Sequence, residues 1–141
     1  MKRAKWMTTM MLMLLSGVAV AQLTSEQKLV THVPFEFTVA NKIVPGGDCV
    51  VQLAPRNTRT LMIRNVGAHV GLFASALPSE TKNPARSYAL VFNHYGNQYF
   101  LSGIKLEGTK AIYRLPESKA EAELRAQNVP HAEEVLLASL N

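Results

Sequence analysis

Cysteine is nearly absent from this chain of 141 residues, in which Cys49 is the single one. One cysteine forms no disulfide within the chain, so the fold depends on burying apolar surface. Zinc sites built from several cysteines are excluded as well. The four histidines, His32, His69, His94 and His131, form neither a His-x-His pair nor an HExxH motif. We therefore predict no metal site and no bound cofactor.

Sequence motifs for catalysis are also missing. No G-x-S-x-G surrounds a serine, and Gly46-Gly47 lacks the lysine and the helix that a phosphate-binding loop requires. Cys49 falls at an inward position of a predicted strand, where a thiol is inert. We predict no catalytic residues. A non-enzymatic function is favoured, and a small hydrolase or metal-dependent enzyme that uses His94 is the alternative.

Long apolar runs are confined to the N-terminus. Three basic residues are followed by an apolar stretch that reaches residue 18, and then by Ala-Val-Ala, the small-x-small pattern that signal peptidase cleaves. The run is shorter than the roughly 20 residues of a membrane-spanning helix. We predict a signal peptide over residues 1–21, cleaved between Ala21 and Gln22. Export to the periplasm, the cell surface or the medium follows, with no stable transmembrane anchor after cleavage.

Excess positive charge largely belongs to this leader. The chain has 15 basic and 10 acidic residues, and removal of the leader leaves 12 basic residues against 10 acidic ones. No cluster of lysine and arginine interleaved with aromatic residues remains. We therefore expect no nucleic-acid partner.

Period-two hydrophobicity predicts about seven short strands. Residues 32–39 place Val33, Phe35 and Phe37 on one face, and Pro34 favours an edge strand or a strand start. The tripeptide Pro-Gly-Gly at 45–47 then reverses the chain. The other predicted strands are 49–53, 60–66, 70–77, 87–95, 98–106 and 110–115, and the polar stretch 78–86 is a predicted surface loop.

Gly96-Asn97 joins two of these strands, 87–95 and 98–106, into a predicted hairpin. This register places His94 opposite Tyr99 and Phe92 opposite Leu101. Because both faces of the hairpin carry apolar groups, we expect it to lie in the centre of a sheet with both faces covered.

Helical patterns begin at about residue 116. The segment 118–127 reads SKAEAELRAQ, in which Ser118 and Glu121 fit a capping box. Glu121 and Arg125 have the spacing of a favourable ion pair, and the glutamates of this segment are expected to be solvated. Pro130, followed by two glutamates, predicts the start of a second helix that docks through its leucines.

These patterns together predict a mainly β protein: an antiparallel β-sandwich or small barrel of about seven strands, with one or two C-terminal helices. Residues 22–141 form the single predicted domain.

Four segments in order, VPFEFTVANKIVPGGDCVVQL, LMIRN, LVFNHYGNQYFLSGI and LPESKAEAEL, resemble a family of small exported bacterial proteins of the type found in acidobacteria. The resemblance covers most of the chain after the leader. It implies an exported β-rich protein and no particular activity. Two departures from the family pattern are Cys49, where an aromatic residue is usual, and Asn93-His94 in place of a His-Arg pair.

Aromatic residues in and beside the central hairpin give the best indication of binding, because exposed rings stack on sugars and on partner side chains. We predict a candidate binding surface of His94, Tyr95, Tyr99 and Tyr113. The corresponding function is an exported binding or structural module of the cell envelope, with a protein or a glycan as partner. An apolar-ligand carrier inside a β-barrel is a further alternative.

Overall fold

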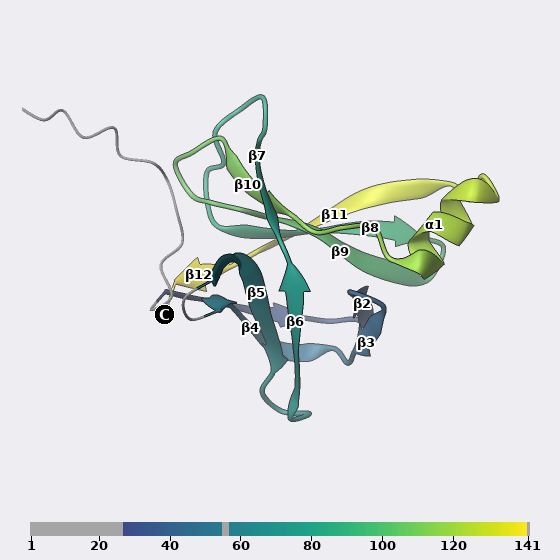
Figure 1. The fold of residues 1–141 in the computed structure, drawn as a ribbon, viewed down its shortest axis with the longest axis horizontal. Helices are drawn as coiled ribbons and strands as arrows, with labels where there is room; N and C mark the ends of the chain where they lie inside the picture. Colours follow the sequence, from purple (N-terminus) through teal and green to yellow (C-terminus); the bar gives the residue numbers. More distant parts are fainter. Residues whose placement is uncertain (1–26, 55–56, 141) are drawn as a thin grey trace, which may run out of the picture.

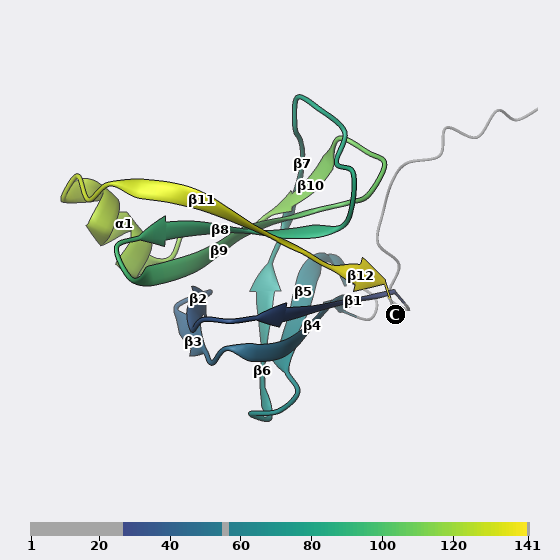
Figure 2. The same ribbon diagram turned by 180° about the vertical axis from the view of Figure 1, so that it is seen from behind.

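The computed structural model describes residues 27–54 and 57–140. These residues form two β-sheets that pack face to face (Figures 1 and 2). The sheets do not close into a barrel, so the predicted sandwich is confirmed and the barrel alternative is wrong. The described residues form twelve strands rather than about seven, because several segments bend and pass from one sheet to the other. The predicted leader, with its cleavage point between Ala21 and Gln22, lies outside the described residues.

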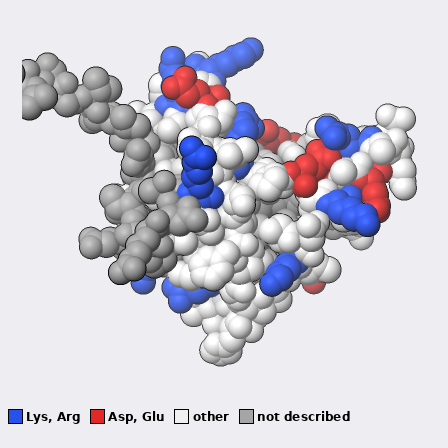
Figure 3. Space-filling view, viewed as in Figure 1, with Lys and Arg blue, Asp and Glu red and all other residues white. Residues whose placement is uncertain are grey.

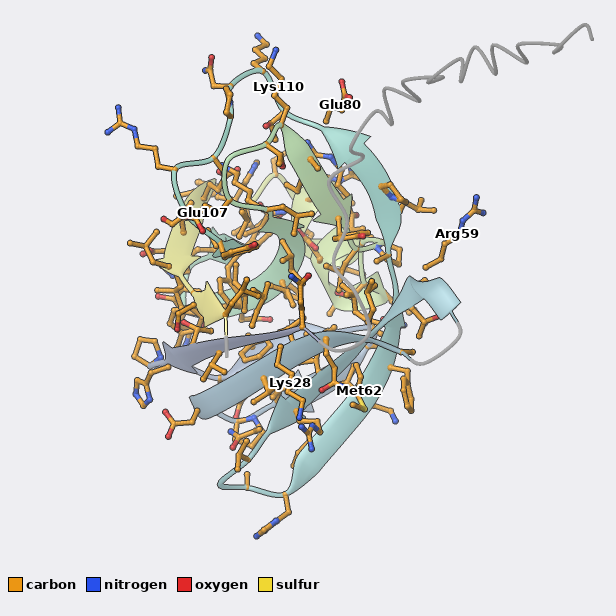
Figure 4. The ribbon with its side chains drawn as sticks, turned by 90° about the vertical axis from the view of Figure 1, so that its left-hand side faces the viewer. Lys28, Arg59, Met62, Glu80, Glu107 and Lys110 are labelled. Carbon is orange, nitrogen blue, oxygen red and sulfur yellow. The ribbon has the colours of Figure 1, made fainter. Side chains whose placement is uncertain are left out.

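The first sheet forms the lower layer in Figure 1. Across the sheet its strands are β12 (Ser139–Leu140), β1 (Lys28–Val33), β4 (Gly47–Ala54), β5 (Asn57–Asn65) and β6 (Val70–Ser75). Cys49, Val51 and Leu53 of β4 are buried against the other sheet, as their alternation predicted. Lys28 and Met62 extend from the opposite, outer face (Figure 4).

The second sheet contains the predicted hairpin at its centre. Across the sheet its strands are β11 (His131–Leu137), β8 (Ala89–Tyr95), β9 (Gln98–Lys105), β10 (Ala111–Arg114) and β7 (Leu77–Glu80). A short pair, β2 (Phe37–Val39) and β3 (Lys42–Val44), joins β9 through a parallel bridge. The predicted register is confirmed, because His94 lies opposite Tyr99 and Phe92 lies opposite Leu101.

Three segments change sheet, and two of them correct the predictions. The single strand expected over 32–39 is wrong: β1 ends before Pro34, which has no N–H to continue the ladder, and the chain enters the second sheet as β2. The expected loop over 78–86 begins as strand β7, which continues β6 beyond the fully buried Ala76. β11 and β12 likewise follow one another across the sandwich.

One apolar core lies between the sheets and includes side chains from both of them. Its largest fully buried members are Phe37, Phe92, Leu29, Leu53, Leu61, Ile63, Leu90 and Ile104. Burial of each such side chain stabilises the folded state by about 1.5–3 kcal/mol. The core therefore supplies the stability of a fold that has no disulfide within the chain.

The single described helix, α1 (Lys119–Ala126), packs on the outer face of β8 and β9. The serine half of the predicted capping box is present, since the hydroxyl of Ser118 accepts a hydrogen bond from the Glu121 N–H at 3.2 Å, whereas Oε1 of Glu121 bonds to the sheet. The expected Glu121–Arg125 pair is wrong. Arg125 instead contacts Glu117 at 3.1 Å, and Glu121 is buried rather than solvated.

The predicted second helix after Pro130 is wrong as well, because residues 131–137 form strand β11. All seven of these residues lie opposite residues of β8 in an antiparallel register. The helix preference of these residues is a weak local effect. The backbone hydrogen bonds along the full length of β8 stabilise the strand more, so tertiary pairing overrides the local preference.

Candidate functional site

The β8–β9 hairpin extends over β2 and β3 (Figures 1 and 2). The rings of Phe35, Tyr99 and His94 form a stack at this place. The centroid of the Tyr99 ring lies 3.7 Å from that of Phe35 and 4.1 Å from that of His94, and both pairs are nearly parallel. The tyrosine ring therefore has a neighbour on each face. Phe35 also contacts the buried Phe92 edge-on, with 5.0 Å between centroids. The stack is thus continuous with the core.

The Pro-Gly-Gly turn at residues 45–47 positions Phe35. A Cβ atom at Gly46 would lie 3.0 Å from the carbonyl oxygens of Val33 and Phe35, so only glycine allows the turn to approach this corner. The buried Asn65 holds the turn from the other side. Its Nδ2 donates to the carbonyl oxygens of Pro45 at 2.7 Å and Gly46 at 3.1 Å. The turn therefore fixes a ring of the site.

Two adjoining hollows meet at Phe35 and Glu36. One has a volume of about 260 Å³ and the other about 320 Å³. The first is lined by Phe35, Glu36, Phe37, Thr38, Ile43, Asn97, Gln98 and Tyr99. The second is lined by His32, Val33, Pro34, Phe35, Glu36, Gly46 and Gly47. We call the two hollows together the corner groove. Its lining combines apolar and aromatic side chains with a carboxylate, from Glu36, and two amides, from Asn97 and Gln98.

The structure separates the four residues predicted as a binding surface. His94 and Tyr99 stack beside the corner groove, and Tyr99 lines it. Tyr113 is buried in the core between the sheets. Tyr95 lies on the opposite face of β8 under α1, where its hydroxyl is 3.3 Å from Oε1 of Glu121. Burial, and then the charge of Glu121, raise the pKa of Tyr95 above its ordinary value.

Two other sets of titratable groups among the described residues are an exposed His–Asp pair and a buried thiol. No three His, Cys, Asp or Glu side chains converge on a metal position within these residues. His32 and Asp48 form an exposed pair with 2.9 Å between Nδ1 and Oδ1. Burial, with the charge of Asp48, raises the pKa of Cys49 to about 11, so its thiol stays protonated at neutral pH.

Sequence reasoning missed most of the groove-lining residues. Alternation over residues 32–39 places Phe35 on the inward face of one continuous strand, whereas the break at Pro34 brings it into the groove. Ile43 lies outside every predicted strand, although an apolar residue shortly before the Pro-Gly-Gly turn is a usable signal. Its side chain is 62% exposed, which is high for an isoleucine beside a hollow.

Searches of protein-family models, of curated proteins and of solved structures returned no match to this chain. Within residues 27–54 and 57–140, no helix has the length and apolar character needed to cross a bilayer.

Proposed function

We propose that the protein is an exported, non-enzymatic binding module of the cell envelope and that its corner groove binds a glycan. The observation that carries the proposal is the mixed lining of the groove. Phe35 and Tyr99 supply aromatic rings, and Glu36, Asn97 and Gln98 supply polar groups in the same hollow. Sugars combine the same two features, with an apolar ring face and a rim of hydroxyl groups.

Each kind of lining residue has a chemical counterpart in such a ligand. Aromatic side chains pack against the C–H face of a sugar ring. Phe35 is the ring assigned this contact, because both faces of Tyr99 are covered by Phe35 and His94 and Tyr99 offers the groove only its edge and hydroxyl. Carboxylate and amide groups accept and donate hydrogen bonds to hydroxyls, and the exposed Glu36 is free to turn toward either hollow. Phe35 lines both hollows, so one ring serves two neighbouring sugar units.

The size of the groove favours a chain over a single sugar. Each hollow lies near or below the lower end of the usual range for ligand pockets, about 300 Å³. The two hollows adjoin at Phe35 and Glu36, and a linear glycan crossing this point occupies both. Envelope polysaccharides present such linear segments to an exported protein.

Export itself rests on the leader pattern of residues 1–21 and on the resemblance to small exported bacterial proteins. On the face shown in Figure 3, basic and acidic side chains are interspersed around α1 rather than gathered by sign.

Titration followed by NMR tests the proposal. Soluble peptidoglycan fragments and linear oligosaccharides are added to the protein, and we expect shifts of the Phe35, Glu36 and Tyr99 signals. Replacing Glu36 by Gln together with Gln98 by Ala should weaken binding about tenfold while leaving the fold intact, since both side chains are exposed.

Phe73→Ala is the matched control, because Phe73 is an aromatic residue that is 62% exposed on β6, outside the groove. This variant should bind like the wild type. The proposal is wrong if the glycans shift no groove signal, or if the double variant binds them as tightly as the wild type.

A further inference from the structure

Strand β11 is an exposed edge of the second sheet. Among the described strands it pairs only with β8, and its other edge has no strand partner. Six of its seven residues are exposed, and Leu136 is half-buried. Edge strands of this kind are templates for pairing with another chain unless they are short or interrupted, and charged side chains on the edge discourage partners that do not complement the charge.

The ladder to β8 shows which backbone groups of β11 face outward. The Ala138 N–H donates to the Tyr88 carbonyl at 2.8 Å, and the same register continues along the whole of β11. Hydrogen-bonded and non-bonded pairs alternate in an antiparallel ladder. Residues 132, 134 and 136 therefore bond to β8, whereas the N–H and C=O groups of His131, Glu133 and Val135 point away from it.

An independent contact supports this assignment. The alternation predicts that the carbonyl of Leu137 also faces away from β8, and this oxygen accepts a hydrogen bond from the Thr31 hydroxyl at 2.9 Å. Residues 131–135 thus retain the outward-facing groups for an added strand.

Other edges of the two sheets are less suited to an added strand. β12 has two residues and β3 has three, and β7 has four with Pro78 among them. β6 has six residues but includes Gly71. β11 is longer than these, and it contains neither proline nor glycine.

Charge identifies the partner. Glu133 and Glu134 are adjacent and exposed, and neither takes part in an ion pair among the described residues. Val135 and Leu137 follow them and are 43% and 70% exposed. A partner strand that complements β11 thus has basic residues opposite the glutamates and apolar residues beside them. A second copy of β11 centred on Glu134 would instead place two carboxylates directly opposite each other, which is destabilising.

We propose that β11 binds an extended, basic peptide segment by strand addition, antiparallel to β11. Outward-facing backbone groups supply the hydrogen bonds. Side chains at two successive positions of the peptide, lysine or arginine, pair with Glu133 and Glu134. This surface is separate from the corner groove, so either proposal stands if the other fails.

The probe is a fluorescein-labelled peptide, VTVKKTT, with both ends blocked, and binding is followed by anisotropy and by NMR. We expect wild-type protein to bind it with shifts along β11, more weakly as salt rises. The E133Q/E134Q variant should bind at least tenfold more weakly, and the peptide VTVEETT should not bind. E80Q should bind like the wild type, because Glu80 is an exposed glutamate on β7, at the opposite edge of the same sheet (Figure 4).

Proline scanning separates strand addition from simple charge attraction. V135P removes an outward N–H and should abolish peptide binding while the protein stays folded, since that N–H makes no bond to β8. E134P removes a ladder bond and should lower the thermal midpoint. Peptide binding by V135P at wild-type affinity would overturn the proposal. So would a dimer of the wild type, seen by analytical ultracentrifugation, that V135P dissociates, because a second copy would then be the occupant.

Discussion

Oε1 of Glu121 lies 2.7 Å from Nδ2 of Asn93, and this contact attaches α1 to the second sheet. The side chain of Glu121 is 4% exposed, so a carboxylate on a polar-looking helix faces the sheet rather than the solvent. The same oxygen accepts the Tyr95 hydroxyl at 3.3 Å. The helix is therefore fixed by a small buried polar network instead of by an apolar stripe.

Replacement of Glu121 by Ala should destabilise the protein by about 1–3 kcal/mol, because the half-buried amide of Asn93 and the buried hydroxyl of Tyr95 lose their acceptor. Glu123→Ala is the matched control: that glutamate is exposed on the same helix, and its loss should change stability by less than about 0.5 kcal/mol. Urea denaturation measures both. Equal effects for the two variants would show that the network does not hold the helix.

A side chain at Gly46 should destabilise the turn. A Cβ atom there would lie 3.0 Å from two backbone carbonyl oxygens, which cannot rotate away as a flexible side chain does. We expect Gly46→Ala to cost about 1–3 kcal/mol in denaturant unfolding and to shift the NMR signals of Phe35 and Tyr99. Gly67→Ala is the control, since its nearest neighbour would be 3.7 Å away. The variant at 67 should have near wild-type stability; a matching loss there would exclude the close approach as the cause.

The central hairpin was predictable from sequence because its determinants are local. The Gly96-Asn97 pair determines the position of the turn. The position of the turn then determines the pairing of His94 with Tyr99. The burial of Cys49 followed from alternation in the same way. Local rules failed where a segment changes partner. The alternation of residues 32–39 continues through Pro34 even though the chain leaves one sheet for the other at this point.

The C-terminal error has a different physical origin. Proline followed by glutamates is a good helix start, and nothing within residues 130–140 reveals that β8 has an unpaired edge. That edge is created by strands more than thirty positions earlier in the chain. The corner groove was unpredictable for the same reason, because Phe35, Ile43 and Gln98 meet only after the topology is known.

Alkaline pH should destabilise the protein through Cys49. Its pKa is raised from 9.0 to about 11 in the folded state, so the unfolded chain loses the thiol proton first as the pH rises. The folded state is then the one that binds more protons, and the free energy of unfolding falls between pH 9 and 11, by on the order of 2 kcal/mol. Urea denaturation at pH 8, 9, 10 and 11 measures this change.

Cys49→Ala removes the titrating thiol. The free energy of unfolding of the variant should therefore fall by about 2 kcal/mol less than that of the wild type between pH 9 and 11. The cavity left by the substitution lowers the stability of the variant equally at every pH, so it does not affect this comparison. Parallel stability curves for wild type and variant across the window would show that the thiol does not contribute.

Truncation of Phe92 should be among the most destabilising substitutions in this protein. Its side chain is fully buried, and it contacts the rings of both Phe35 and Phe37 edge-on, with centroids 5.0 and 5.2 Å away. Truncation to Ala leaves a cavity between the sheets and should cost about 3–5 kcal/mol, which is a large part of the stability of a domain of this size. Phe92→Leu fills more of the space and should cost less, so it keeps the test measurable if the alanine variant does not fold.

The aromatic stack adds a second readout of the Phe92 variants. Without its edge contact to Phe92, Phe35 loses a neighbour, and the NMR signals of Tyr99 should broaden or shift even in the leucine variant. A loss below about 0.5 kcal/mol for the alanine variant would contradict the inward position of Phe92 and, with it, the continuity between the core and the corner groove.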